Sequence, residues 1–318
     1  MGVSVAEYLG QRTDVDNPVI SPVNVSTSRA ERNDLKRRGR IPSCPFVDGN
    51  ICKKIRSGYE PVCSVRKSDG TLWLNCSERL CATKKNLPIS RYQRGILLQA
   101  GRFIYNSSVT PDQVCVKREA RLSVIESTDY NADFIIALQG DNRDYTGPDR
   151  LVLEMQGGGE TTNTGEMTQH IRGWKASHER NNCLLRQETA ASTLETNAWR
   201  RQQEQFIVKG NIAMKSQRGC GIAFCVGTLL FDYLMGKLAS ANLPDLREYN
   251  WSLAVIGFKE DTDFPKQAGS IPLIVDQSRL LYTNYQTFVQ ALINQGEPTP
   301  NAFRGEFVNL NNESVTFR

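Results

Sequence analysis

Short apolar runs separated by polar segments predict the strands of this chain. Residues 132–137 and 151–156 are mostly apolar, and each run is short enough for a β-strand rather than a helix. The polar segment between them, 139–150, contains two glycines and a proline and is typical of a hairpin loop. We therefore predict an antiparallel hairpin that carries one acidic residue on each arm, Asp133 and Glu154.

The same patterns predict an α/β fold for the rest of the chain. The further elements that we expect are helices over 91–102, 187–206 and 276–294 and buried strands over 220–226 and 251–258. Strands and helices alternate over 119–294, which favours a mixed central sheet with helices on both faces. Residues 1–40 are predicted to be a polar, irregular arm, and their basic cluster 36–40 is either a solvated surface or a DNA contact.

Composition narrows the classes of protein without selecting one. The 318 residues allow one or two domains, and a net charge of +5 permits nucleic-acid binding without proving it. With only two histidines, a histidine-based metal site or a Ser-His-Asp hydrolase is disfavoured. No run is long enough to span a membrane, and the N-terminus lacks an apolar signal segment, so we expect no membrane partner and a cytoplasmic location.

The two acids of the hairpin are candidates for a metal site. Carboxylates held side by side repel each other unless a cation lies between them, and hard oxygen ligands suit Mg²⁺. Glu119, on a preceding element, is a third acid that can join them. Taken singly, an acid near a strand start is more often a turn cap, and an acid on a strand usually faces solvent. Because Glu154 follows an apolar run, we place it at the end of a buried strand.

Cysteines indicate a second, structural metal site. The chain has nine, an odd number without an export signal, which argues against a disulfide framework. Five of them lie close together in sequence, and four thiolates close a tetrahedral site around zinc or iron. We choose Cys44, Cys52, Cys63 and Cys76 as ligands and leave Cys81 as the spare. The alternative is five buried or free thiols.

Two groups of motifs together resemble a known family. The cysteine segments are Cys44-Pro45-Phe46, Cys52-Lys53-Lys54, Cys63-Ser64-Val65 and Cys76-Ser77-Glu78-Arg79-Leu80. With the downstream Glu119, Asp133 and Glu154-x-Gln156 positions, they resemble restriction endonucleases of the NotI and EagI type. That family belongs to the PD-(D/E)xK nucleases, in a Glu-x-Gln variant. The resemblance covers roughly residues 40 to 235. The sequence departs from the general motif at two positions, with Ala132 in place of the proline and Gln156 in place of the lysine.

The resemblance implies a bacterial, cytoplasmic type II restriction endonuclease. It implies a PD-(D/E)xK core over 101–318 and, over 1–100, an arm with a four-cysteine module that holds iron or zinc. It further implies a homodimer that cuts double-stranded DNA at a GC-rich palindrome with Mg²⁺, alongside a cognate DNA methyltransferase. The implied catalytic residues are Asp133, Glu154, Gln156 and Glu119. Gln156 cannot act as a cation but can orient the attacking water. The rival functions are a non-catalytic DNA-binding protein and a structure-specific repair nuclease.

Two further features are open to more than one interpretation. The glycines at 157–159 allow close approach of a neighbour, either a DNA backbone or nothing more than a flexible loop. Basic side chains that are candidates for reading DNA bases are Arg172, Lys175, Arg180, Arg200 and Lys215.

Overall fold

The computed structural model describes residues 2–125, 128–140, 145–177, 183–216, 219–294, 296–301, 304–312 and 316–317. Its strands are β1 (Val3–Tyr8), β2 (Gln11–Arg12), β3 (Val62–Lys67), β4 (Leu72–Trp73), β5 (Val114–Leu122), β6 (Tyr130–Leu138), β7 (Arg150–Gln156), β8 (Gly221–Gly227), β9 (Leu253–Glu260), β10 (Leu273–Thr283), β11 (Phe307–Val308) and β12 (Thr316–Phe317). Its helices are α1 (Arg29–Arg37), α2 (Lys53–Arg56), α3 (Arg91–Ile104), α4 (Thr164–Ala176), α5 (Glu195–Glu204), α6 (Gly210–Met214), α7 (Thr228–Leu238) and α8 (Tyr285–Ile293). Short helical turns are η1 (Leu184–Arg186), the π-helical η2 (Gln205–Lys209) and η3 (Ala239–Ala241).

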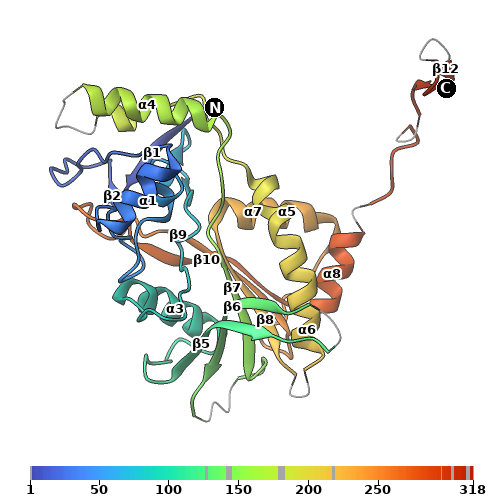
Figure 1. The fold of residues 1–318 in the computed structure, drawn as a ribbon. Coiled ribbons are helices and arrows are strands. Elements are labelled where there is room, and N and C mark those ends of the chain that lie inside the picture. The colour runs from blue at the N-terminus through green and yellow to red at the C-terminus, as the bar shows by residue number, and fades with distance from the viewer. Residues whose placement is uncertain are drawn as a thin grey trace.

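A six-stranded mixed sheet forms the centre of the molecule (Figure 1). Its strand order is β10-β9-β8-β7-β6-β5. The strand β6 is antiparallel to both of its neighbours, β5 and β7, whereas β7, β8 and β9 run parallel and β10 returns antiparallel to β9. The predicted mixed α/β fold is therefore confirmed, and so is the antiparallel hairpin of β6 and β7.

Helices cover both faces of this sheet. Successive side chains of a strand point to opposite faces, so its buried strands present apolar side chains to the helices on each side. Leu151 and Leu153 of β7 lie in one core cluster with Ile96 and Leu97 of α3. Val152, between them, lies in the other cluster, which also contains residues of α5, α7 and α8. In Figure 1, α3 lies on one side of the sheet, and α5, α6, α7 and α8 lie on the other.

A smaller antiparallel sheet, of order β2-β1-β3-β4, is built from the N-terminal residues. The prediction of an irregular arm over 1–40 is therefore wrong for the first two strands, of which β1 is almost wholly buried. Val3 and Val5 belong to the same core cluster as the α5 side of the large sheet. The side chain of Glu7 in β1 has no exposed surface at all.

Glu7 fixes the small sheet to its surroundings through a buried ion pair with Arg79. Glu7 Oε2 lies 2.6 Å from Arg79 Nε and accepts a hydrogen bond from Ser64 Oγ at 2.6 Å. Its Oε1 accepts a hydrogen bond from the backbone N–H of Ile271 at 2.8 Å. Both carboxylate oxygens that burial removes from water are thus matched by donors, which is the condition under which a buried charge is tolerated.

Breaking this pair is expected to destabilise the fold strongly. In Arg79→Met the Glu7 carboxylate stays buried without its cation, and we expect the free energy of unfolding to fall by about 3–5 kcal/mol. Urea unfolding measures this change. The control is Asp34→Asn in the exposed Asp34–Arg37 pair, which should change the stability by less than about 1 kcal/mol. Equal losses in the two variants would contradict the role given to Glu7.

Two helix predictions need correction. The expected helix over 276–294 is wrong in its first half, because residues up to Thr283 continue β10 and only α8 is helical. After a register shift, Leu280–Thr283 form backbone hydrogen bonds with β9. This pairing holds the stretch as a strand. The helix expected over 187–206 begins only at Glu195 and then continues through the π-helical turn into α6.

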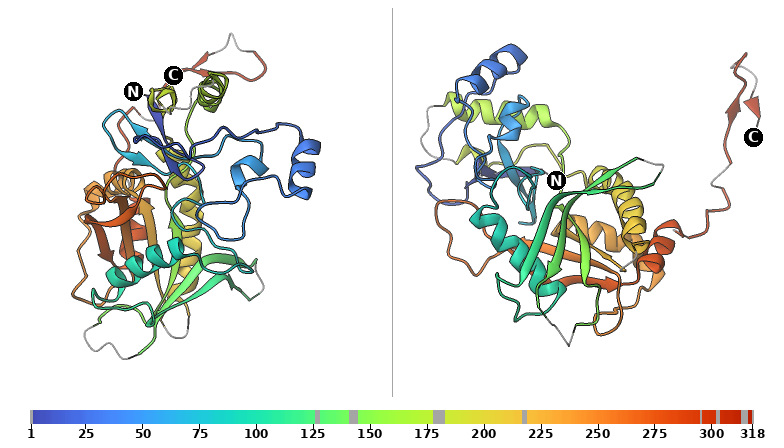
Figure 2. Two further views of the ribbon diagram at one scale, coloured as in Figure 1. Left: turned by 90° about the vertical axis from the view of Figure 1, so that its left-hand side faces the viewer. Right: turned by 60° about the horizontal axis from the view of Figure 1, so that its bottom comes forward.

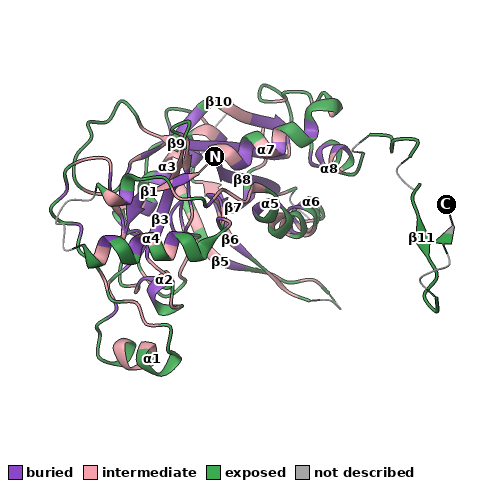
Figure 3. Ribbon diagram, turned by 90° about the horizontal axis from the view of Figure 1, so that it is seen from above, coloured by how far each residue is buried: buried purple, intermediate pink, exposed green. Residues whose placement is uncertain are grey.

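Two segments project from the body of the protein. Figure 2 shows α1 standing out on one side and the C-terminal residues extending away on the other. Figure 3 shows that both are largely exposed. Phe303 and Arg318, the ends of the polar C-terminal tail as the sequence defines it, lie outside the described residues. None of the helices in the described ranges combines the length and apolar character needed to cross a lipid bilayer.

Candidate catalytic site

Asp133 and Glu154 lie opposite each other at the end of the β6–β7 pairing. Phe134 pairs with Leu153, so the next position brings the two acids together. The backbone N–H of Met155 donates to Asp133 Oδ2 at 2.9 Å, and the backbone N–H of Asp133 donates to Glu154 Oε1 at 3.3 Å. Each carboxylate thus accepts a backbone hydrogen bond from the other arm, and the predicted juxtaposition is confirmed.

The surroundings of the pair favour a cation. Burial raises the pKa of Glu154 to about 7, and the Asp133 carboxylate adds to this increase while Lys209 opposes it. Burial also raises the pKa of Asp133, again against the effect of Lys209. Both carboxylates are therefore destabilised as anions, and positive charge placed between them would stabilise them.

Lys209 is the residue of this site that the sequence did not reveal. Its Nζ lies 2.8 Å from both oxygens of Glu154, and the exposed fractions of the two side chains are 4% and 5%. It comes from η2, where the helix widens to π-helical geometry, a feature often found at functional sites. The available sequence signal was a lysine directly after the apolar run 206–208 and before Gly210.

Glu119 of β5 reaches the same site from the neighbouring strand. Its backbone has φ of +42°, which is unusual for a residue with a side chain and costs free energy. Its Oε2 accepts a hydrogen bond from the backbone N–H of Lys85 at 3.0 Å. The Glu119 charge contributes to the raised pKa of Asp133, after the larger effect of burial. The structure therefore places all three predicted acids on the lining of one cavity, but not close enough together to form a three-acid metal site.

Gln156 is held by hydrogen bonds to its neighbours. Its Oε1 accepts from Gln202 Nε2 of α5 at 2.9 Å, and its Nε2 donates to the backbone oxygen of Gly158. The glycines that follow pack against the chain itself, since a Cβ at Gly158 would lie 2.7 Å from the backbone oxygen of Leu74. Of the two interpretations of 157–159, neither a DNA contact nor a flexible loop describes this packing.

These side chains line one polar cavity of about 420 Å³, which we call the hairpin cavity. Three of its acids, Glu119, Asp133 and Glu154, come from β5, β6 and β7, and its cationic side chains come from other elements. Its lining residues are Lys53, Ser77, Glu78, Cys81, Ala82, Thr83, Lys84, Glu119, Asn131, Asp133, Glu154, Met155, Gln156, Arg201, Gln202, Gln205 and Lys209. Acids beside cations in a hollow are the groups that phosphodiester chemistry requires.

The donor chemistry of the hairpin cavity fits Mg²⁺. Proteins bind this ion through one or two carboxylates and leave the remaining positions to water and substrate phosphate. Asp133 and Glu154 supply that number. Within the described ranges, no three His, Cys, Asp or Glu side chains are grouped closely enough to hold a metal ion by themselves. An ion here would therefore take its other ligands from water or substrate.

The four chosen cysteines share one neighbourhood. Cys44, Cys52, Cys63 and Cys76 are all buried, and the backbone N–H of Cys76 donates to the Cys63 oxygen at 3.0 Å. Burial raises the pKa of the other three thiols, and the nearby Cys76 contributes to each increase. Cys81 lies elsewhere, because the groups that add to the burial effect on its pKa are Cys225 and Asp133.

A buried carboxylate completes this cysteine group. Glu78 is 4% exposed, and its Oε2 has no hydrogen-bond partner among the described residues. The same side chain lies within hydrogen-bonding reach of the Cys44 thiol. Leaving a buried carboxylate oxygen unpaired costs free energy, and a cation bound by the surrounding thiolates would satisfy it. Thiolates are donors that suit zinc or iron, but the four cysteines are free thiols here, and no three of the described His, Cys, Asp and Glu side chains, these included, are grouped closely enough to hold an ion.

The basic side chains selected from the sequence differ in their contacts and exposure. Lys175 is engaged, because its Nζ lies 2.6 Å from Glu60 Oε2 and donates to the Val23 backbone oxygen. Arg172, Arg200 and Lys215 are exposed. Arg180 lies outside the described residues. For the exposed three, DNA contact stays a prediction, whereas Lys175 forms contacts within the protein.

Comparisons with known proteins do not assign the chain to a family. No model of a protein family matches the chain, and no curated protein matches it in sequence. What the chain does must therefore follow from its own residues.

Proposed function

We propose that this chain is a Mg²⁺-dependent endonuclease with a PD-(D/E)xK core, acting as a type II restriction enzyme on double-stranded DNA. The observation that supports this most is the pair Asp133 and Glu154, held face to face beside Lys209 in the hairpin cavity. A lone acidic pair has many explanations. An acidic pair with a lysine, an oriented amide and a hollow for a phosphate has far fewer.

Each residue has a distinct task in this proposal. Asp133 and Glu154 hold Mg²⁺, which when bound lowers the pKa of a water and stabilises charge on the phosphate. Lys209 neutralises Glu154 and places positive charge where the transition state gains negative charge. Gln156, fixed by Gln202, orients the attacking water through its amide. Lys209 thus takes the part of the lysine that Gln156 replaces in the motif.

The remaining parts of the assignment extend from the resemblance. We include a GC-rich target and a cognate methyltransferase. We also include a homodimer, because a palindrome presents two equivalent half-sites. The cysteine group binds structural iron or zinc, and its ligands are Cys44, Cys52, Cys63 and Cys76. The segment 76–84 joins this group to the wall of the hairpin cavity.

Incubation of plasmids with the protein and Mg²⁺ tests the proposed function. We expect each plasmid to give its own set of discrete fragments, which is reproduced in repeated digests. Without Mg²⁺ we expect no fragments. Binding without cutting would indicate a non-catalytic DNA-binding protein. Cutting that follows branched or damaged structure in oligonucleotides, irrespective of sequence, would indicate a repair nuclease. Either outcome would overturn the restriction assignment.

The cysteine assignment makes a separate prediction. The purified chain is expected to carry about one iron or zinc ion, since four thiolates close one tetrahedral site. Cys76→Ser should lose this ion, whereas Cys81→Ser, which alters a buried thiol in another neighbourhood, should retain it. Elemental analysis by mass spectrometry measures both. Metal loss in Cys81→Ser together with retention in Cys76→Ser would reverse the choice of ligands.

A further inference from the structure

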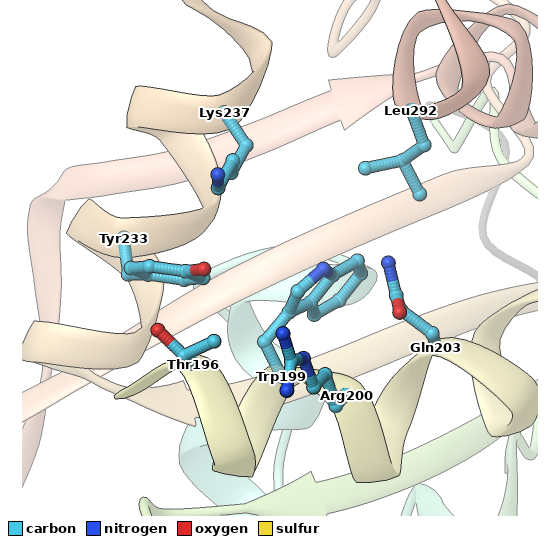
Figure 4. A pocket seen from close by; sticks show the side chains of 7 residues that line it. All are labelled: Thr196, Trp199, Arg200, Gln203, Tyr233, Lys237 and Leu292. Atoms are coloured by element: carbon cyan, nitrogen blue, oxygen red, sulfur yellow. The ribbon is translucent and has the colours of Figure 1, made fainter. Parts of the chain in front are cut away.

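A second, smaller cavity lies on the far side of α5 from the hairpin cavity. It has a volume of about 250 Å³, below the usual range for drug-sized ligands, and fits a small group. Figure 4 shows side chains from three helices directed toward one space. They are Thr196, Trp199, Arg200 and Gln203 of α5, Tyr233 and Lys237 of α7, and Leu292 of α8.

The lining of this cavity is rich in hydrogen-bond donors and lacks acids. Arg200 and Lys237 are cations, and no described carboxylate forms an ion pair with either of them. The hydroxyls of Thr196 and Tyr233 can also donate. Lys237 Nζ lies 5.6 Å from the centroid of the Tyr233 ring, which holds the ammonium group over the opening by a cation–π contact.

Trp199 supplies the most specific sign of a ligand. Its side chain is 4% exposed, and its ring is fixed by an edge contact with Phe206 at 5.2 Å between centroids. Its indole N–H forms no hydrogen bond with a described residue and points into the cavity (Figure 4). The buried unpaired side-chain atoms of the described residues do not include this nitrogen, so the N–H is open to the cavity and available to an acceptor on a ligand there. The ring is rigid, so this donor is already oriented before any ligand arrives.

We propose that this cavity binds a phosphate group. An anion with several acceptor oxygens satisfies the indole N–H, the hydroxyls and both cations at once, and a phosphate has the required charge and oxygens. The source is either a backbone phosphate of DNA away from the cut or a free phosphate. This site does not depend on the proposed nuclease function, because nothing in it requires metal or cleavage.

Binding measurements without divalent cations test the site. Calorimetric titration with inorganic phosphate, and anisotropy with a labelled 20-base-pair duplex at several salt concentrations, separate the two sources. Lys237→Gln and Arg200→Gln are the test variants, and both side chains are exposed, so the core is not disturbed. Lys117→Gln on β5 is the charge-matched control, since it removes an exposed cation outside this cavity and the hairpin cavity.

Loss of one charged hydrogen bond is expected to weaken binding about tenfold. If free phosphate is the ligand, Lys237→Gln and Arg200→Gln weaken its binding and Lys117→Gln does not. If the ligand is a DNA phosphate, the same two variants weaken duplex binding and reduce its dependence on log salt by about one, more than the control does. Unchanged affinity for both probes, or losses no larger than those of Lys117→Gln, would overturn the site.

Discussion

Asp133→Asn and Glu154→Gln are each expected to lower the rate of Mg²⁺-dependent DNA cleavage by roughly 10³-fold or more. The metal supplies several kcal/mol of transition-state stabilisation, and about 1.4 kcal/mol corresponds to tenfold in rate. Either change removes a carboxylate charge without altering the shape of the side chain. Single-turnover cleavage of a plasmid that carries the target measures the effect.

Binding of DNA by these variants is expected to persist. Anisotropy without divalent ions should give affinities equal to or above that of the wild type, because less negative charge then faces the phosphates. Asp149→Asn is the matched control, since Asp149 is an exposed acid near the start of β7 that does not line the hairpin cavity. A Glu154→Gln enzyme that cuts at the rate of Asp149→Asn would remove the basis of the nuclease assignment.

The raised pKa of Glu154 also predicts how the free energy of unfolding depends on pH. The pKa is about 7 in the folded protein against an ordinary value of 4.5, so the folded state binds a proton where the unfolded state has lost it. Without divalent ions, the stabilisation from this proton is complete below pH 4.5 and is lost as the pH rises through 7. Urea unfolding across this pH range should show the decline in the wild type and a smaller one in Glu154→Gln. Mg²⁺ should reduce the decline in the wild type.

Lys209→Gln is expected to slow cleavage by about 10²–10³-fold, the usual effect of removing one preorganised donor from a transition-state site. It also leaves Glu154 buried without its cation, which lowers the free energy of unfolding by about 3–5 kcal/mol. Mg²⁺ replaces part of the lost positive charge, so added Mg²⁺ should stabilise this variant more than the wild type. Thermal unfolding with and without the ion, followed by cleavage assays below the melting temperature, measures both effects.

A double variant separates catalysis from stability. In Lys209→Met with Glu154→Gln, neither charge remains, and stability should recover to near that of the wild type because no unpaired ion is buried. Cleavage should stay absent. A Lys209→Gln protein that is folded and cuts normally would show that the ion pair serves only packing. Failure of the double variant to recover stability would show that Lys209 has contacts other than Glu154.

Local patterns in the sequence were sufficient for the hairpin. The apolar runs on either side of a polar turn determine the pairing of β6 with β7, and that pairing places Asp133 opposite Glu154. The position of Lys209 could not be obtained this way. Its partner is 55 residues away in sequence, and the contact depends on a helix that widens into a π-helical turn between two strands.

Contacts between residues far apart in sequence explain the two wrong predictions for β1 and β10. The prediction of an irregular arm over 1–40 missed β1, where Glu7 is buried against Arg79 and the backbone of Ile271, 264 residues away. No local pattern reveals a donor at that separation. The strand β10 was mistaken for a helix because its pairing with β9, and not the propensity of its residues, determines its conformation.

The stretch from Cys76 to Lys84 connects two kinds of chemistry. Its first residues lie among the thiols, and its later residues line the hollow where the phosphate would be cut. On the proposed assignment, a chelator that strips soft metals would deform this wall and lower DNA cleavage even with Mg²⁺ in excess. Sensitivity to thiol-binding ions would then reach the active centre from the cysteine group, because the thiol that lines the cavity, Cys81, is buried and its pKa is raised by that burial.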